Sequence, residues 1–398
     1  MKVLYILPQP YLLPRGSSFR ALATLDGLAQ LGHDVDVVCY GIGNDPPNMR
    51  YKIHRAARPF GIASVKIGPS PAKILFDVPL YWTARGLVRR RRYDVIHGVE
   101  EAGFMAAWLG RKHRIPYVYD MHSWMSQQIE GTRFGRWKIL LQLFKRMELR
   151  SMRDAAAILT VGDDMTRRLR EELAPGVHAA TLPDCPLNFV EPPDPDRCQK
   201  IVREYFPAGR KSIVYTGNFH VYQGLDLLIE ATAILKQKAT TREPFAVLIV
   251  GGGAGEREAV TRLKEKVKSL GLDDVVIFCG EHPMADVPVF MERADLLVSS
   301  RISGNNVPLK IYTFLAAGVP MVATRITSHT QVLNEQNCLL ADPEPAAFAD
   351  ALFRGLYELP AEQREQIVRE AKKVTPEEQR ARFREVLRVA YARCAGKS

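Results

Sequence analysis

Short apolar runs alternate with amphipathic helical segments along the first half of the chain. The first apolar run, KVLYILP, precedes the amphipathic segment SSFRALATLDGLAQLG. Further runs of the same kind are HDVDVVCY, YDVIHGV, PYVYDMH and AAAILTVG. Short β-branched runs that are bounded by turn residues and separated by helical stretches are typical of buried parallel strands. The first half is therefore expected to fold as an α/β domain with a doubly wound parallel sheet.

A proline-rich segment separates this half from a second one. Five prolines lie within residues 183–195, and proline disrupts both helix interiors and central strands. The alternation then starts again, with the apolar runs SIVYTGN, FAVLIVGGG, VVIFCGE, DLLVSS and MVAT. We expect an N-terminal Rossmann-like domain over residues 1–188 and a C-terminal one over 189–375, followed by an amphipathic helix over 376–398 that packs back on the N-terminal domain. Ligands bind at the carboxyl ends of the strands in such sheets, so two facing domains of this kind leave a ligand-binding cleft.

Positive charge is concentrated in the first half. The chain of 398 residues has a formal net charge of +11 at pH 7, and residues 1–190 contribute +10 of it. The segments 85–94 and 131–154 mix Arg and Lys with apolar and aromatic residues, and the second has the pattern of a helix with an apolar and a cationic stripe. Such a surface suits an anionic lipid headgroup layer, although a solvated face over a buried stripe gives the same pattern. Nucleic acid is not expected as a partner, because no recognised binding motif accompanies these charges.

Neither export nor a membrane span is expected. The apolar run at the start is too short for a signal peptide, and no later run approaches the roughly 20 residues that cross a bilayer. The cysteines contain no CxxC pair, which argues against a disulfide framework or a zinc site and favours buried free thiols. They are Cys39, Cys185, Cys198, Cys279, Cys338 and Cys394. We expect a cytoplasmic protein that associates at most peripherally with the inner face of the membrane.

Nine motifs follow one another along the chain in an informative order. They are PRGSSFRALATLDGLAQLGHDVDVV, YDVIH, YDMHS, YTGNFHVYQGLDLLIEA, IVGGG, VVIFCGE, ADLLVSS, PLKIYTFLAAGVPMVAT and NEQNCLLADPEPAAFADAL. In type and order they resemble the GT-B glycosyltransferases, specifically the large retaining group known as glycosyltransferase family 4. The resemblance implies two facing Rossmann-like domains and the transfer of a sugar, with retention, from a nucleoside-diphosphate sugar to an acceptor hydroxyl. The expected setting is the synthesis of an envelope glycan or exopolysaccharide, with a glycan or lipid-linked acceptor.

Neither a cofactor nor a metal ion is expected beside the nucleotide-sugar donor. The resemblance implies that backbone amides, a lysine and helix ends hold the diphosphate. Residues 215–313, which contain the donor-binding candidates of the second half, also include no Asp-x-Asp element.

Candidate acceptor-side residues follow the expected strands of the first half. His122 ends the run PYVYDMH and should lie at the carboxyl edge of the sheet. The resemblance implies that a histidine at this place contacts the transferred sugar, so His122 is a catalytic candidate, with Asp120 and Glu101 as weaker acceptor-side candidates. Gly16 lies between the first strand and a helix, where backbone amides either face an anionic group of the donor or only form a tight turn.

The second half contains the residues expected to bind the donor. Family relatives commonly place an Arg and a Lys near the TG motif to hold the diphosphate, whereas this chain has Asn218 and Gln223 at those positions. The two amides can hydrogen-bond to phosphate but cannot neutralise its charge. We therefore assign phosphate binding to Lys310, a catalytic candidate, and to backbone amides of residues 304–309. The other donor-binding candidates in this half are Gly217, Gly280, Glu281, Asn306, Leu309 and Thr313.

Two carboxylates that are common in the family are absent. The Glu-x7-Glu pattern of relatives falls on Asn305 and Thr313, which are neutral but can form hydrogen bonds. The resemblance places Asn305 near the transferring sugar, as a catalytic candidate, and Thr313 near the nucleotide ribose. A retaining transfer in this family depends chiefly on stabilising the leaving diphosphate and the developing cationic sugar, with no obligatory protein nucleophile. The substitutions are therefore compatible with an active enzyme.

Two alternatives to a glycosyltransferase remain open at this point. A nucleotide-sugar-binding pseudo-enzyme or assembly partner would bind the donor without turnover. A nucleotide-sugar epimerase can use the same double fold, but it needs acid and base carboxylates near the sugar, which the neutral donor region lacks.

Overall fold

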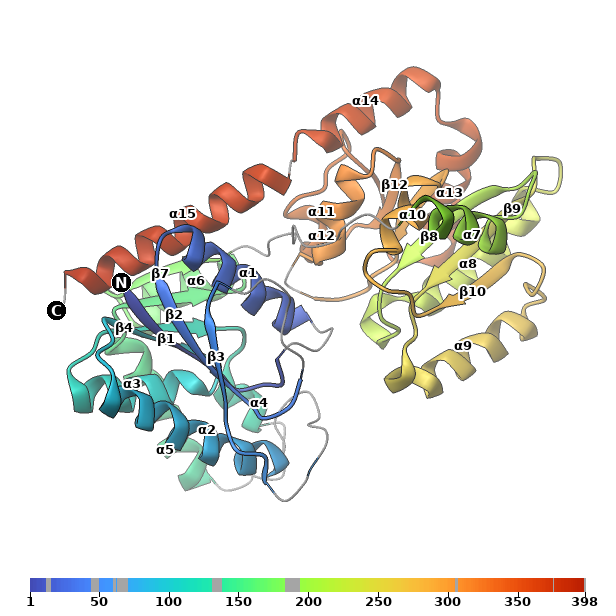
Figure 1. Cartoon of the computed structure of the whole chain (residues 1–398). Coiled ribbons are helices and arrows are strands. Elements are labelled where there is room, and N and C mark those ends of the chain that lie inside the picture. Colours follow the sequence, from blue (N-terminus) through green and yellow to red (C-terminus); the bar gives the residue numbers. More distant parts are fainter. Residues whose placement is uncertain are drawn as a thin grey trace. The chain divides into compact units, whose positions relative to one another are not determined.

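The computed structural model describes residues 1–396 except 12–15, 44–49, 60–61, 63–70, 131–137, 183–193, 305–306 and 375 (Figure 1). The chain forms two compact units, of which the first comprises Met1–Cys185 with Arg380–Ser398 and the second Pro186–Gln379. Each unit has its own parallel sheet. The α/β fold with two parallel sheets that the alternating pattern predicts is confirmed.

The first unit contains a seven-stranded sheet with the order β3-β2-β1-β4-β5-β6-β7. Its strands are β1 (Lys2–Leu7), β2 (Asp34–Cys39), β3 (Lys52–Arg55), β4 (Val95–Val99), β5 (Tyr117–Met121), β6 (Ala157–Thr160) and β7 (His178–Thr181). Every residue of β4, β5 and β6 is buried, as expected for a parallel sheet that is covered on both faces. The order of strands reverses between β1 and β4, so the loops that follow these two strands lie at a topological switch point.

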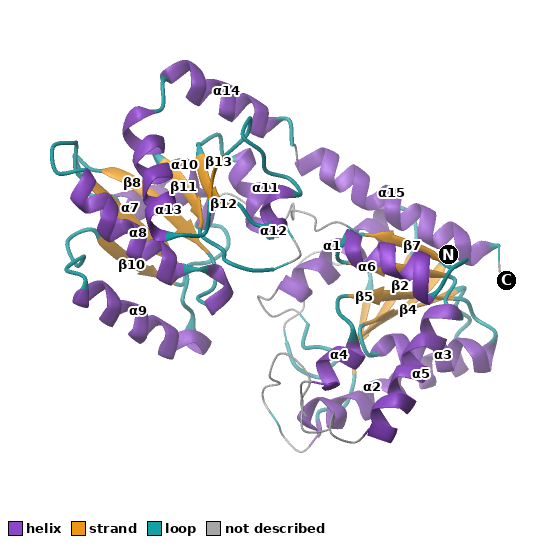
Figure 2. Cartoon of the chain, turned by 180° about the vertical axis from the view of Figure 1, so that it is seen from behind, coloured by secondary structure: helices purple, strands orange, loops and turns teal. Residues whose placement is uncertain are grey.

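Helices cover both faces of this sheet. The helices of the first unit are α1 (Gly16–Gln30), α2 (Pro71–Arg90), α3 (Ala102–His113), α4 (Met125–Glu130), α5 (Lys138–Arg153), α6 (Asp163–Arg168) with a π-helical extension (Leu169–Leu173), and most of α15 (Pro376–Ala395). Figures 1 and 2 show α2, α3 and α5 on one face and α1 with α15 on the other. Helix α15 packs closely on α1, because a Cβ at Gly27 would lie 2.9 Å from Leu387 Cδ1. Of the basic segment 131–154, residues 138–153 form α5, whereas 131–137 lie outside the described residues.

The second unit contains a six-stranded sheet with the order β10-β9-β8-β11-β12-β13. Its strands are β8 (Lys211–Thr216), β9 (Phe245–Val250), β10 (Val276–Gly280), β11 (Leu296–Ser299), β12 (Met321–Thr324) and β13 (Leu339–Ala341). Its helices are α7 (Pro195–Tyr205), α8 (Leu225–Lys238), α9 (Arg257–Ser269), α10 (Val287–Glu292), α11 (Leu309–Ala316), α12 (Thr327–Thr330), α13 (Pro345–Phe353) and α14 (Ala361–Lys372), with short 3-10 or π segments at Val221–Gln223, Ala254–Glu256 and Arg354–Glu358. The order reverses between β8 and β11, which makes the loops after these strands the switch point of this unit.

Apolar side chains form a core on each face of the second sheet. Leu228 of α8 and Phe348 of α13 belong to one core, and Phe290 of α10 and Phe314 of α11 belong to the other. None of the described residues belongs to a helix that is long and apolar enough to span a membrane.

Candidate functional site

The carboxyl edge of the first sheet places Glu100 and His122 side by side. Glu100 follows β4 directly and His122 follows β5 directly. The backbone amide of Glu100 donates a hydrogen bond to the carbonyl of Asp120 at 2.9 Å, which fixes the two strand ends to each other. Glu100 has a φ of 50°, a conformation that is rare for residues other than glycine. The side-chain atoms His122 Nδ1 and Glu100 Oε1 lie 3.9 Å apart.

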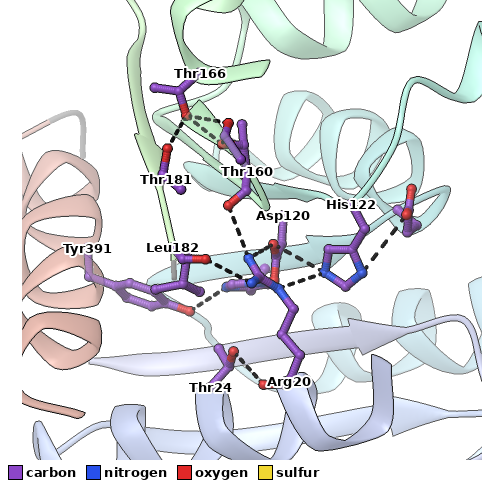
Figure 3. Close-up of polar contacts among 12 residues, drawn as sticks. Arg20, Thr24, Asp120, His122, Thr160, Thr166, Thr181, Leu182 and Tyr391 are labelled. Carbon is purple, nitrogen blue, oxygen red and sulfur yellow. Dashed lines mark hydrogen bonds and ion pairs between the residues drawn. The ribbon is translucent and has the colours of Figure 1, made fainter. Parts of the chain in front are cut away.

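Arg20 of α1 lies next to His122 and is almost fully buried (Figure 3). Its Nε donates a hydrogen bond to His122 Nε2 at 3.1 Å, and its Nη2 donates to Asp120 Oδ1 at 3.2 Å. The Nη1 and Nη2 groups also donate to the carbonyls of Leu182 and Thr160, at 2.9 and 3.3 Å. Arg20 was not among the predicted residues, and its only signal in the sequence is a cation inside an amphipathic helix, next to Phe19 and Ala21.

Asp120 is a buried anion that several cationic or polar groups surround. Burial alone would raise the pKa of its carboxyl, but Arg20 and His122 hold that pKa well below its usual range. Its second oxygen lies 3.5 Å from His97 Nε2. Burial lowers the pKa of His97, and the hydroxyl of Tyr391 in α15 lies 2.9 Å from His97 Nδ1. With its carboxylate engaged in this way, Asp120 is placed to support His122 and Arg20.

The carboxylate of Glu100 is largely buried. Burial raises its pKa to about 7, against the opposing influence of His122. The Ser123 hydroxyl donates hydrogen bonds to both carboxylate oxygens, at 3.1 and 3.2 Å. Glu100 was not among the predicted residues, although it stands directly before the candidate Glu101 and is the first residue after the strand.

Glu101 belongs to a neighbouring group of side chains. Its carboxylate forms an ion pair with Lys73 of α2. In the same helix, burial and the charge of Glu101 raise the pKa of Asp77 to about 7, and the Tyr40 hydroxyl donates a hydrogen bond to Asp77 at 2.6 Å. This edge of the sheet is therefore rich in carboxylates. Gly16 is the first residue of α1, and the preceding residues 12–15 lie outside the described part of the chain.

In the second unit, Lys310 lies at the switch point between β8 and β11. It is the second residue of α11, and its ammonium group lies 4.1 Å from the centre of the Tyr215 ring. The group donates hydrogen bonds to the Thr216 carbonyl at 3.2 Å and to Gln223 Oε1 at 3.4 Å. Burial, with the nearby charge of Arg301 as a second cause, lowers the pKa of Lys310 to about 7.

Arg301, which was not among the predicted residues, is a second cation at this switch point. It follows β11, and its guanidinium lies over the Tyr222 ring, 5.1 Å from the ring centre. Its Nε donates a hydrogen bond to the carbonyl of Ser303 at 2.7 Å. Two cations thus lie near each other at the carboxyl edge, where they favour an anionic ligand.

His329 borders the two cations without adding charge. Burial lowers its pKa to about 4, and the charges of Lys310 and Arg301 contribute in the same direction. Its Nδ1 lies 2.8 Å from the Thr324 carbonyl, so this nitrogen carries the proton, and Nε2 accepts from the Ser299 hydroxyl at 3.0 Å.

Tight backbone turns bring the loops after β8 and β11 together. Gly224 has a φ of 68°, and a Cβ at this position would lie 1.9 Å from the carbonyl oxygen of Ser300. The Ser300 hydroxyl donates to the Gln223 carbonyl at 3.0 Å, and the Ile302 amide donates to the Tyr222 carbonyl at 2.9 Å. The loops need a glycine here, because any side chain would push them apart.

The other predicted donor residues surround these two loops or lie beyond them. Gly217 follows β8 with a φ of 145°, and an added Cβ would lie 3.6 Å from Lys310 Nζ. Asn218 is exposed, and its side chain accepts a hydrogen bond from the His220 amide at 3.4 Å. The Thr313 hydroxyl donates to the Lys310 carbonyl at 2.8 Å within α11, the helix that Leu309 begins.

Gly280 and Glu281 lie at the end of β10. Gly280 has a φ of 79°, and the exposed Glu281 carboxylate lies against the turn at Gly253, where a Cβ would come within 2.5 Å of Glu281 Oε2. Asn305 and Asn306 lie outside the described residues. Among the residues that the structure describes, no group of three or more His, Cys, Asp or Glu side chains is arranged to hold a metal ion.

The fold, with two parallel sheets that each have a switch point, defines the class of protein. Sucrose-phosphate synthase from Thermosynechococcus elongatus has a TM-score of 0.73 with this chain at 17% identity, and the match covers 98% of this chain and 99% of that structure. HepE from Anabaena, solved in complex with UDP and glucose, has a TM-score of 0.69 at 16% identity, covering 98% of this chain and 100% of the other. The chain has the two-domain GT-B fold.

Family comparisons give the narrower assignment. Residues 15–185 match the family described as "Glycosyl transferase 4-like domain", and residues 210–357 match "Glycosyl transferases group 1". The chain therefore belongs to the GT-B glycosyltransferases of the family 4 type, as its motifs predict.

Curated relatives match parts of the chain. D-inositol 3-phosphate glycosyltransferase from Arthrobacter sp. is 26% identical over 285 residues, which are 68% of this chain and 63% of the relative. Mannosylfructose-phosphate synthase from Agrobacterium fabrum is 34% identical over 139 residues, which are 33% of this chain and 29% of that protein. The match thus spans less than two thirds of the length of these two relatives.

Proposed function

We propose that this protein is a glycosyltransferase that moves a sugar from a nucleoside-diphosphate sugar to an acceptor hydroxyl. The observation that carries the proposal is the pair of cations, Lys310 and Arg301, at the switch point of the second sheet. A nucleotide-sugar donor presents its diphosphate as a compact anion, and ligands of such sheets bind at this edge. HepE, which has the same fold, was solved with UDP-glucose.

Lys310 and Arg301 can neutralise the charge of the diphosphate, whereas the neutral Asn218 and Gln223 cannot. Charge develops on the diphosphate as the bond to the sugar breaks, and preorganised cations stabilise it without moving. Lys310 is partly buried beside the Tyr215 ring, and its pKa is lowered to about 7. An anion next to it favours the protonated amine, so donor binding should be coupled to the uptake of a proton by Lys310.

Retention of configuration and independence of metal ions are part of the same proposal. They follow from the family resemblance and from a transition state that needs stabilisation of the leaving group and no protein nucleophile. No further cofactor is proposed.

We propose that the acceptor binds at the carboxyl edge of the first sheet, near His122 and Glu100. The carboxyl groups of Glu100, Glu101 and Asp77 lie at this edge and can accept hydrogen bonds, which favours a polyol hydroxyl over a phosphorylated acceptor. Two relatives have names that include a phosphorylated compound, D-inositol 3-phosphate glycosyltransferase and mannosylfructose-phosphate synthase. A glycan or lipid-linked acceptor in envelope or exopolysaccharide synthesis fits a neutral hydroxyl.

A donor screen tests the proposal. The purified protein is incubated with uridine, guanosine and adenosine diphosphate sugars, and thermal stabilisation and release of free nucleotide are measured. We expect one donor to stabilise the protein and to be cleaved slowly, and both effects to disappear in Lys310→Ala. Lys268→Ala, an exposed lysine of the same unit, is the matched control and should behave like the wild type.

The pH dependence gives a second readout of the same site. Free Lys310 loses its proton above about pH 7, so donor affinity should fall as the pH rises from 7 to 9. This dependence should be absent in Lys310→Ala. Donor binding without turnover by any supplied acceptor would instead identify a pseudo-enzyme, and an unresponsive protein with every donor would refute the proposed function.

A further inference from the structure

The contacts of Arg20 determine how a neighbouring histidine can be protonated. The guanidinium has five N–H donors and no acceptor, and it stays charged in proteins. Its Nε points at His122 Nε2, with 3.1 Å between the two nitrogens (Figure 3). A hydrogen bond across this distance exists only when Nε2 carries a lone pair, so Nε2 must accept.

The remaining contacts hold the guanidinium in this orientation. The Nη1 group donates to the Leu182 carbonyl, and Nη2 donates to the Thr160 carbonyl and to Asp120 Oδ1. Two of these acceptors are backbone oxygens at the ends of neighbouring strands, which cannot rotate away as side chains can. Arg20 therefore has little freedom to turn its Nε from the imidazole.

In a competing arrangement, His122 Nε2 would carry the proton and donate it to Asp120, but the distances disfavour this arrangement. The Asp120 Oδ1 atom lies 3.4 Å from His122 Nε2, farther than the Arg20 nitrogen. A proton on Nε2 could be shared with Asp120, but it would then face the Nε–H of Arg20 directly. The same carboxylate is already held by Arg20 through Oδ1 and lies near His97 through Oδ2.

We propose that Arg20 is a positioning residue that fixes the neutral His122 ring in the tautomer with its proton on Nδ1. Because Nδ1 lies on the side of Glu100, 3.9 Å from Oε1, the ring presents an N–H donor at the sheet edge where the substrate is proposed to bind. His122 then donates a hydrogen bond to a substrate hydroxyl through Nδ1. The tautomer itself is a property of the free protein, and only its use in catalysis rests on the proposed function.

Nitrogen NMR of the imidazole rings tests the tautomer directly. The full-length protein is labelled with ¹⁵N in its histidines, and His122 is assigned by the signals missing from His122→Asn. At pH 8 we expect Nδ1 of His122 to give the signal of a protonated ring nitrogen and Nε2 that of an unprotonated one. A protonated Nε2 in the wild type would overturn the proposal without any further variant.

Two substitutions then separate Arg20 from Asp120 as the cause. Arg20→Lys keeps a positive charge beside Asp120 but removes the Nε–H, so the proton of His122 should move to Nε2 and face Asp120. In Asp120→Asn, Arg20 still donates to Nε2, and the proton should stay on Nδ1. A proton that stays on Nδ1 in Arg20→Lys, or that moves to Nε2 in Asp120→Asn, would refute the role of Arg20.

A matched control guards against general effects of arginine replacement. Arg170→Lys changes another arginine of the first unit that donates to a strand carbonyl, that of Ala179 at 2.8 Å, and it should leave the His122 signals unchanged. Thermal unfolding of each variant verifies that it is folded. Failure of donor turnover in the screen would leave the NMR result untouched, so the two proposals fail separately.

Discussion

At the scale of single residues, the pKa of Glu100 reflects the burial of its carboxylate. Its carboxylate lies at the end of β4, largely buried, with Ser123 and His122 as neighbours. Burial raises its pKa from 4.5 to about 7. Between these two pH values the folded protein binds more protons than the unfolded chain, so the free energy of unfolding decreases as the pH rises through this window.

Replacing Glu100 by glutamine should remove this pH dependence. Glu100→Gln keeps the shape and can still accept from Ser123, but it cannot ionise. Relative to the wild type, we expect the variant to gain stability on going from pH 5 to pH 8, on the order of 2 kcal/mol. Urea unfolding followed by tryptophan fluorescence measures this effect specifically, because all four tryptophans, residues 82, 108, 124 and 137, lie in the first unit.

The control for this prediction is Glu171→Gln, an exposed glutamate in the same unit. Its stability difference from the wild type should stay constant between pH 5 and pH 8. An equal shift in both variants, or none in Glu100→Gln, would contradict the interpretation of Glu100.

At the scale of elements, the proposed donor site depends on two loops held together at one glycine. The loops after β8 and β11 are joined through Gln223, Ser300 and Ile302, and Gly224 allows their backbones to approach. The loop after β11 leads through Arg301 to α11, which supplies Lys310. The distance between the two loops therefore controls where the cations lie.

Gly224→Ala should separate these loops. The added Cβ would lie 1.9 Å from the Ser300 carbonyl oxygen, so the backbone must move, and nucleotide-sugar binding should be lost or reduced at least tenfold. Isothermal titration with the donor found in the screen measures the loss. Gly209→Ala is a close control, since Gly209 has a similar φ of 70° but no neighbouring atom within 4 Å.

The control variant experiences the same backbone strain without the collision. It should lose about 1–2 kcal/mol of stability, as a left-handed conformation costs any residue with a side chain, and keep its donor affinity. Equal losses of affinity in both variants would show that backbone strain, and not the position of the loops, causes the effect.

At the scale of the whole molecule, positive charge and exposed aromatic residues occur together in the first unit. Trp82 of α2 and Trp108 of α3 are about half exposed, at 56% and 47%. The Arg85 and Lys112 side chains lie over their rings, at 4.7 and 5.0 Å from the ring centres. We propose that the face formed by α2, α3 and α5 contacts an anionic membrane surface, which brings the enzyme to a lipid-linked acceptor.

Vesicle sedimentation tests this contact. The protein should bind vesicles that contain phosphatidylglycerol, bind pure phosphatidylcholine vesicles weakly, and dissociate as salt screens the charges. The double variant Trp82→Ala, Trp108→Ala should reduce binding severalfold. Exposed apolar residues of the second unit offer a control, and Leu270→Ala should have no effect. Vesicle binding that changes neither with lipid charge nor on replacement of both tryptophans would refute the contact.

The elements that lie farthest inside each sheet were the easiest to predict. The strands β1, β4 and β5 are apolar runs flanked by turn residues, and burial on both faces requires that composition. The edge strands β3, β7 and β13 have only three or four residues, and the sequence analysis did not separate them from loops. Short edge strands bury little surface, so their sequences show little periodicity.

The candidate site could be predicted where a residue directly follows a central strand. His122 was predicted in this way and Lys310 from the motif PLKIYTFLAAGVPMVAT, and both stay predictions, whereas Glu100 was passed over for its neighbour Glu101. Their side chains reach different partners, since Glu100 faces Ser123 and Glu101 pairs with Lys73. Consecutive residues of a turn point in different directions, and sequence spacing alone does not define those directions.

The sequence by itself determined the two α/β units, their parallel sheets, the family, and the sheet edges at which ligands are expected to bind. These features follow from local patterns, because the spacing of apolar residues close together in sequence indicates which strand or helix face is buried. Only the tertiary structure decided that Arg20 meets His122 and that Tyr391 reaches His97, across 102 and 294 positions of sequence. It also placed Arg301 beside Lys310. Such contacts depend on how complete elements pack, and that packing fixes the charges and tautomers on which the proposed chemistry rests.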